Sequence, residues 1–184
     1  MKSPNTQPVG ADFGPLASPH GAIELSAPRL DDGAAVTALI ASCPPLDPNS
    51  AYCNLLQCSH FAETGVIARM DAEVVGWVSA YLQPQAPDTV FVWQVAVAAE
   101  ARGLGLGRRM LEELLDRPAC SGVRFLKTSI TPDNTASWKL FASLAARLGA
   151  QLEAAPWLAE GEHLPKGHAR EDLVTIGPFA LRAA

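Results

Sequence analysis

The sequence has no run of 18 consecutive apolar residues and no block of lysine and arginine. The first absence excludes a membrane-spanning helix. The second, together with a net charge of −5, argues against nucleic acid as the main partner. Charged residues make up 18% of the chain and hydrophobic ones 48%, a balance typical of a soluble globular protein rather than a disordered one.

Residues 1–21 lack the apolar segment of a secretory signal peptide and instead contain recurrent prolines and glycines. We therefore expect residues 1–21 to form a disordered tail and residues 22–184 to form a single domain in the cytoplasm.

The four cysteines show no Cys-x-x-Cys spacing of the kind that binds zinc. A cluster of Cys53, Cys58 and His60 is an alternative metal site, but a free thiol is more often a small buried apolar group. We predict thiols in a reducing compartment and no metal ion.

Residues 90–98 form an apolar run interrupted only by Gln94 and rich in β-branched and aromatic residues. This composition predicts a strand buried on both faces. A glycine-rich turn over residues 102–107 follows, and then a helical pattern of apolar residues from Leu106 to Leu115. A strand, a glycine turn and a helix N-terminus together favour an anion-binding site.

Two common phosphate motifs do not fit this turn. The third glycine of a dinucleotide fingerprint is replaced by Arg108, and no Gly-Lys-Ser/Thr follows as in a P-loop. The alternative to an anion-binding site is that the turn binds no ligand and its glycines only allow a helix to pack tightly on a strand.

The rest of the chain predicts one mixed α/β domain around a curved sheet. Further strands are expected over residues 23–27, 64–70, 74–82, 123–130, 151–155 and 173–179. Helices are expected after Asp31, around Tyr52 and Leu56, and from Asn134 to Gly149. Residues 83–88 and 156–170 are expected to be loops, because prolines and glycines interrupt them.

The pattern Arg-x-x-Gly-x-Gly, formed by Arg102, Gly105 and Gly107, resembles the pyrophosphate loop of the GNAT superfamily of N-acyltransferases. The resemblance implies a six- to seven-stranded mixed sheet flanked by helices, with acetyl-CoA as the co-substrate. The coenzyme-binding residues that it implies are Gln94, Val95, Ala96, Val97, Arg102, Gly103, Leu104, Gly105, Leu106, Gly107, Arg108, Asn134 and Ser137.

One position departs from this family. Many relatives have a tyrosine seven residues after the asparagine as general acid, and here that position is Phe141. Phe141 is expected in the core. The thiolate then leaves unassisted, another hydroxyl such as that of Tyr52 serves, or the domain is inactive.

Residues 46–61, 91–97 and 131–138 resemble the L-2,4-diaminobutyrate acetyltransferases of ectoine biosynthesis. Residues 127–130 match loosely, and residues 167–171 keep the family pattern only in part. The resemblance implies acetylation of the 4-amino group of L-2,4-diaminobutyrate. The alternatives are a GNAT enzyme for another small amine and a catalytically silent module that binds acyl-CoA.

A diamino acid needs acceptors for its ammonium groups and donors for its carboxylate. The candidate substrate-binding residues are Asp47, Ser50, Tyr52, Asn54 and Trp93, and the candidate catalytic residues are Tyr52, His168 and Glu171. Helix capping and packing are equally good explanations for Ser50 and Asn54, and capping alone for Asp47. We also expect a homodimer that forms through the outer strands, with residues 173–181 at the edge.

Overall fold

The computed structural model describes residues 16–18 and 21–180. Most of the predicted N-terminal tail lies outside the described residues. Within it, however, Leu16–Ser18 forms strand β1, which pairs antiparallel with β2 (Gly21–Ser26). The tail prediction is therefore wrong for these residues, because residues 16–18 find a strand partner that no local pattern announces.

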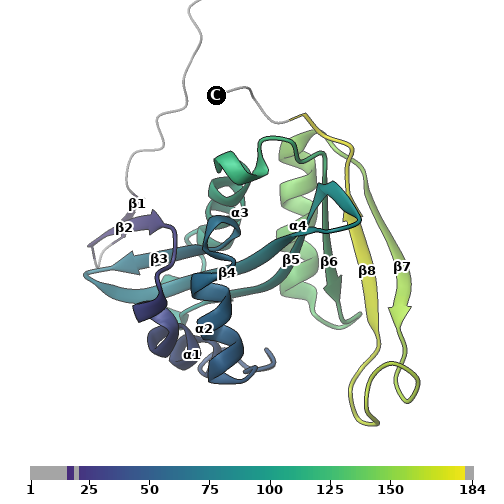
Figure 1. Cartoon of the computed structure of the whole chain (residues 1–184), viewed down its shortest axis with the longest axis horizontal. Coiled ribbons are helices and arrows are strands. Elements are labelled where there is room, and N and C mark those ends of the chain that lie inside the picture. Colours follow the sequence, from purple (N-terminus) through teal and green to yellow (C-terminus); the bar gives the residue numbers. More distant parts are fainter. Residues whose placement is uncertain (1–15, 19–20, 181–184) are drawn as a thin grey trace, which may run out of the picture.

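The described strands form one mixed sheet in the order β1-β2-β3-β4-β5-β6-β8-β7 (Figure 1). Among the described strands, β5 and β6 form the one parallel pair. The remaining strands are β3 (Val66–Met70), β4 (Glu73–Gln83), β5 (Ala86–Val97), β6 (Phe125–Ile130), β7 (Leu152–Leu158) and β8 (Glu171–Ile176). The sheet has eight described strands rather than six or seven because β1 extends it.

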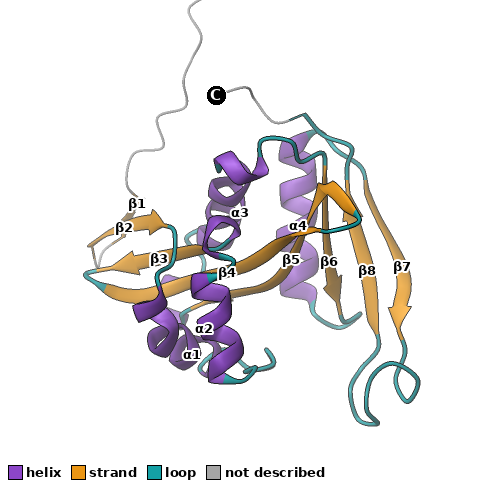
Figure 2. Cartoon of the chain, in the orientation of Figure 1, coloured by secondary structure: helices purple, strands orange, loops and turns teal. Residues whose placement is uncertain are grey.

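In the described part of the chain, four α-helices lie on the two faces of the sheet, an arrangement that can be followed in Figure 2. They are α1 (Gly33–Ala41), α2 (Ala51–Ser59), α3 (Leu106–Leu115) and α4 (Thr135–Leu148). A Cβ on Gly76 of β4 would meet Met110 of α3, so Gly76 faces α3. Its neighbour Trp77, fully buried, faces the layer of α1 and α2, because successive strand residues point to opposite faces. No helix in the described part of the chain is long and apolar enough to cross a membrane.

The predicted loop over residues 83–88 is mostly strand. β4 and β5 form a long hairpin in which Gln83 pairs with Ala86. Pro87 is tolerated because the register shifts after Leu82, so its missing N–H breaks no regular ladder.

The C-terminal strands also differ from the prediction. β7 continues through Pro156 to Leu158, with a register shift at that proline. β8 starts at Glu171 and ends at Ile176, because Gly177 takes a φ of +146° and Pro178 follows. β8 pairs with both β6 and β7, so β7 rather than the segment 173–181 forms the edge of the sheet.

Candidate functional site

The turn between β5 and α3 needs glycine at two positions. Gly103 and Gly105 have φ values of +79° and +71°, and Gly105 is the N-cap of α3. Gly107 has a different role, since a Cβ there would lie 3.5 Å from Leu140 of α4 and 3.7 Å from Val95. These are ordinary van der Waals distances, so Gly107 lies at the contact of α3 with α4 and β5 without needing to be glycine, whereas Gly103 and Gly105 shape the turn that leads to the α3 N-terminus.

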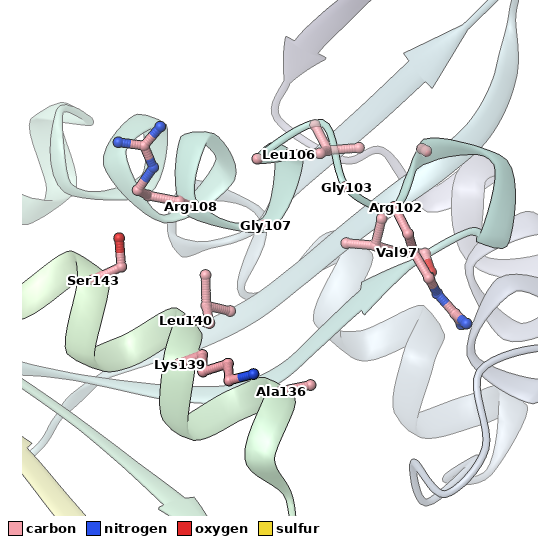
Figure 3. A pocket seen from close by; sticks show the side chains of 12 residues that line it. Val97, Arg102, Gly103, Leu106, Gly107, Arg108, Ala136, Lys139, Leu140 and Ser143 are labelled. Carbon is pink, nitrogen blue, oxygen red and sulfur yellow. The ribbon is translucent and has the colours of Figure 1, made fainter.

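A pocket of about 500 Å³ opens between this turn and α4 (Figure 3). Its described lining contains three cations and no acidic residue. The lining residues are Val97, Ala101, Arg102, Gly103, Gly105, Leu106, Gly107, Arg108, Ala136, Lys139, Leu140 and Ser143. Cationic side chains beside a helix N-terminus suit a ligand with several phosphates.

Most of the predicted coenzyme loop lines this pocket, but Leu104 instead packs against the core. The sequence reading missed Lys139 and Ser143 on α4. A usable signal was present, because residues 136, 139, 140 and 143 recur at helical spacing on one face. Arg102 turns toward the end of β5, where its Nε donates to the Val97 carbonyl oxygen at 3.1 Å.

β5 and β6 separate beside the pocket. Their parallel register ends at Phe91 and Lys127, whereas β5 continues to pair with β4 as far as Val97. Among the described residues, no strand therefore pairs with the β6-facing edge of β5 beyond Phe91. Its free N–H and C=O groups can hydrogen-bond an extended ligand that runs into the pocket past Val97.

The opened part of β5 contains a bulge. Gln94 pairs with Ser79 and Val92 pairs with Ala80, which leaves Trp93 without a partner in β4. The bulge turns Trp93 outward, and its side chain is 47% exposed although the strand around it is mostly buried. Trp93 is therefore not a core residue, and its contact with substrate stays a prediction.

The loop of residues 46–50 lies against this strand. The Gln94 side chain donates from Nε2 to the Asp47 carbonyl oxygen at 2.6 Å and accepts from Asn49 Nδ2 at 3.0 Å. The exposed Asp47 carboxylate accepts through Oδ1 from the backbone N–H of Asn49 at 2.9 Å. No hydrogen bond within the described chain occupies Oδ2 of Asp47, which leaves this oxygen available to a ligand.

Ser50 and Asn54 are engaged in holding the fold. The Ser50 hydroxyl accepts from Cys53 N at 3.1 Å and caps α2. Asn54 is fully buried, and its Nδ2 donates to Thr37 Oγ1 and to the Pro48 carbonyl oxygen. Tyr52, in contrast, is 70% exposed on the first turn of α2.

The remaining predicted residues lie elsewhere. His168 is exposed in the β7–β8 connection, and Glu171 is the first residue of β8, paired with Leu158. No interaction in the described chain joins either residue to Asp47 or Tyr52. Asn134 caps α4 by accepting from Ser137 N at 3.0 Å, and Phe141 is buried in the core as predicted.

An aromatic contact near the site was not predicted. The ring of Phe91 lies 5.4 Å from that of Tyr81 and 6.0 Å from that of Trp157, measured between centroids. These rings link β4, β5 and β7, so the pairing depends on strands far apart in the sequence. Within the described ranges, no group of three or more His, Cys, Asp or Glu side chains is placed to hold a metal ion.

Known proteins resemble this chain in sequence and fold. Residues 34–145 match the acetyltransferase (GNAT) family. The L-2,4-diaminobutyric acid acetyltransferase of Methylotuvimicrobium alcaliphilum is 52% identical over 157 residues, which cover 85% of this chain and 91% of that protein. The enzyme of the same name from Bordetella parapertussis is 44% identical, with 97% of each chain covered.

A solved structure agrees with these relatives. Diaminobutyrate acetyltransferase EctA from Paenibacillus lautus, in complex with L-2,4-diaminobutyric acid and coenzyme A, superposes with a TM-score of 0.84 at 37% identity. The match covers 89% of this chain and 99% of that one. The glycine turn, the separated strands and these similarities agree, and the chain belongs to the acetyltransferase (GNAT) family.

Proposed function

We propose that this protein transfers the acetyl group of acetyl-CoA to the 4-amino group of L-2,4-diaminobutyrate, as a step of ectoine biosynthesis. The observation that carries the proposal is the direct attachment of the Asp47 loop to β5 through Gln94. A carboxylate suited to an ammonium group is thereby held beside the strand edge that continues into the cationic pocket. The sequence relatives and the Paenibacillus lautus complex support the same substrates.

The pocket fits the phosphate end of acetyl-CoA. Arg108 and Lys139 supply positive charge from α3 and α4, and the turn around Gly103 and Gly105 brings the α3 N-terminus to the phosphates. The open edge of β5 then offers backbone groups to the arm that carries the thioester, and an N–H there stabilises the oxyanion. Acetyl-CoA supplies an already activated acyl group, so the proposal includes no metal ion.

Asp47 and Trp93 are proposed to bind the diamino acid. Asp47 accepts hydrogen bonds from the α-ammonium group of the substrate. The exposed face of Trp93 packs against the same ammonium group. Ser50 and Asn54 support the loop and helix that present Asp47.

The reacting amine must be deprotonated, since an alkyl ammonium group has a pKa of about 10.4. We propose that His168 and Glu171 accept this proton through water. Tyr52 is proposed to protonate the departing thiolate, because Phe141 has no hydroxyl and is buried. Tyr52 comes from α2 and the other two from the β7–β8 region, so the proposal requires the bound substrates to lie between these elements.

A homodimer through the outer strands is also proposed. β7 is an edge strand whose middle residues, including Trp157 at 43% exposure, are exposed. A second copy pairing along this edge would cover its unpaired backbone groups. The cytoplasm as the location of the protein stays a prediction.

The proposed function is tested by free-thiol release from acetyl-CoA with L-2,4-diaminobutyrate, L-ornithine, L-lysine and putrescine, with NMR identification of the acetylated nitrogen. We expect the fastest turnover with diaminobutyrate, acetylated at its terminal nitrogen. Faster turnover of another amine would keep the reaction type and overturn the substrate. Acetyl-CoA binding without any turnover would instead identify a silent module.

A further inference from the structure

Gln94 is a buried polar residue in the middle of the strand that opens toward the coenzyme pocket. Its side chain is 6% exposed, yet both ends of its amide are engaged outside the sheet. The Nε2 group donates to the backbone of Asp47 and the Oε1 atom accepts from Asn49, 47 and 45 residues away in sequence. A buried side-chain amide on β5 thus holds the loop that precedes α2.

The 46–50 loop has few other attachments. It belongs to no helix or strand, and its residues 47, 48 and 50 are exposed. Asn49 has a φ of +53°, a conformation that favours Asn or Gly, and this turn aims its side chain at Gln94. The two ends of the loop are anchored, because Leu46 N donates to the Cys43 carbonyl oxygen and Ser50 caps α2. Between these ends, the other hydrogen bond to residues 47–49 from outside the loop is a longer one, 3.3 Å from Asn54 Nδ2 to the Pro48 carbonyl oxygen.

We propose that Gln94 is a positioning residue that sets the distance between the Asp47 carboxylate and the open edge of β5. The inference rests on the proposed function, in which Asp47 binds the amine substrate and β5 binds the thioester arm. Gln94 directly follows the bulge at Trp93, so its side chain connects the loop to the same short segment of backbone that faces the thioester.

Such a connection matters because amide formation requires the attacking nitrogen close to the thioester carbon. Misplacement by about 1 Å can cost a factor of about 100 in rate. Without Gln94, the part of the loop between Leu46 and Ser50 would be held only by the Pro48 carbonyl oxygen, which would leave Asp47 a range of positions. The two hydrogen bonds of Gln94 remove that freedom, and both ends of its amide are engaged by the loop, whereas the backbone groups of residues 94–97 are proposed to bind the thioester arm.

The test compares Gln94→Leu with Gln151→Leu, a matched change at an exposed position just before β7. For Gln94→Leu we expect kcat/KM for diaminobutyrate to fall by about tenfold to a hundredfold. The KM for acetyl-CoA and the Kd for coenzyme A by calorimetry should stay within about twofold of the parent values, as expected when β5 and the pocket are intact. Gln151→Leu should match the parent in every measurement.

A second variant, Asn49→Gly, removes the partner amide but suits the positive φ, so it provides a test if Gln94→Leu folds poorly. We expect the double variant to lose no more kcat/KM than Gln94→Leu alone, because both changes break one connection. Multiplicative losses would overturn the proposal. So would a raised KM for acetyl-CoA alone, or parent kinetics in both single variants.

The ratio of each variant's kcat/KM to that of the parent is measured with whichever amine the parent acetylates fastest. If that amine is not diaminobutyrate, the proposed substrate fails while the ratios still decide the role of Gln94. If the losses in kcat/KM merely track a fall in Tm, with coenzyme A binding reduced in parallel, Gln94 is a structural residue only and the inference is wrong.

Discussion

Glu112 of α3 and Arg147 of α4 form an ion pair that joins the two helices flanking the pocket proposed to bind the coenzyme. The same carboxylate lies 3.9 Å from Nη1 of Arg108, one of the pocket cations. The Glu112 side chain is only 18% exposed, so these two arginines replace part of its contact with water. The pair therefore links α3 to α4, and the Glu112 carboxylate places a negative charge beside Arg108.

Arg147→Ala should lower the free energy of unfolding by about 1 kcal/mol, because Glu112 loses a partner in a partly buried position while Arg147 itself is half exposed. Urea unfolding checks this value. Arg124→Ala, an exposed arginine without an ion pair in the described chain, is the control and should leave stability unchanged. A loss above about 3 kcal/mol would show that the pair behaves as a buried one.

Gly105→Glu should abolish acetyl-CoA binding. A side chain at a φ of +71° strains the turn, and a carboxylate there lies beside Arg108, which the phosphates need. We expect the Kd for coenzyme A to rise at least about a hundredfold, since charge of the wrong sign enters the anion site. Gly122→Glu is the matched control, because a Cβ at Gly122 meets nothing within 4 Å. Retained coenzyme affinity in Gly105→Glu would place the phosphates elsewhere.

Asp47→Asn should raise the KM for the amine by about tenfold or more, because the charge that attracts an ammonium group is lost while the hydrogen bond from Asn49 N can still be accepted. Affinity for acetyl-CoA should not change. Steady-state kinetics with each substrate varied in turn separates the two effects. Kinetics equal to those of the parent would show that Asp47 only caps the loop.

Cys58 and Cys120 should resist alkylation in the folded protein. Burial raises the pKa of each thiol to about 11; Asp32 adds to the rise at Cys58, and Arg117 opposes it at Cys120. Because the thiolate is the nucleophile, iodoacetamide at pH 8 should label the half-buried Cys53 first. Mass spectrometry of peptides identifies the labelled sites, and equal labelling of Cys53, Cys58 and Cys120 would contradict the buried placement.

The same shift predicts a pH dependence of stability. The folded state favours the neutral thiols, whereas the unfolded chain ionises near its ordinary value of 9.0. The free energy of unfolding should therefore fall as the pH rises from about 9 toward 11, by on the order of 1 kcal/mol per thiol at pH 10. Replacing both thiols with alanine should remove this part of the pH dependence.

Several parts of the site follow from local sequence alone. The glycine turn at Gly103 and Gly105, the apolar face of α3 and the Asn134 cap of α4 all depend on residues within a few positions of one another. The buried position of Phe141 follows from the same helical period. Short-range patterns of this kind report directly on backbone conformation and on which face of an element is buried.

Other parts depend on which strands pair. β1 is a strand because β2 lies beside it, β8 is internal because it pairs on both sides, and Trp93 is exposed because the β4–β5 register shifts. The amide of Gln94 holds the 46–50 loop across more than forty residues of sequence. The sequence by itself determined the local elements and the glycine turn before α3, whereas tertiary structure decided the sheet edge and the attachment of the loop. Register and side-chain contacts between distant segments depend on non-local packing, which no periodicity within one segment encodes.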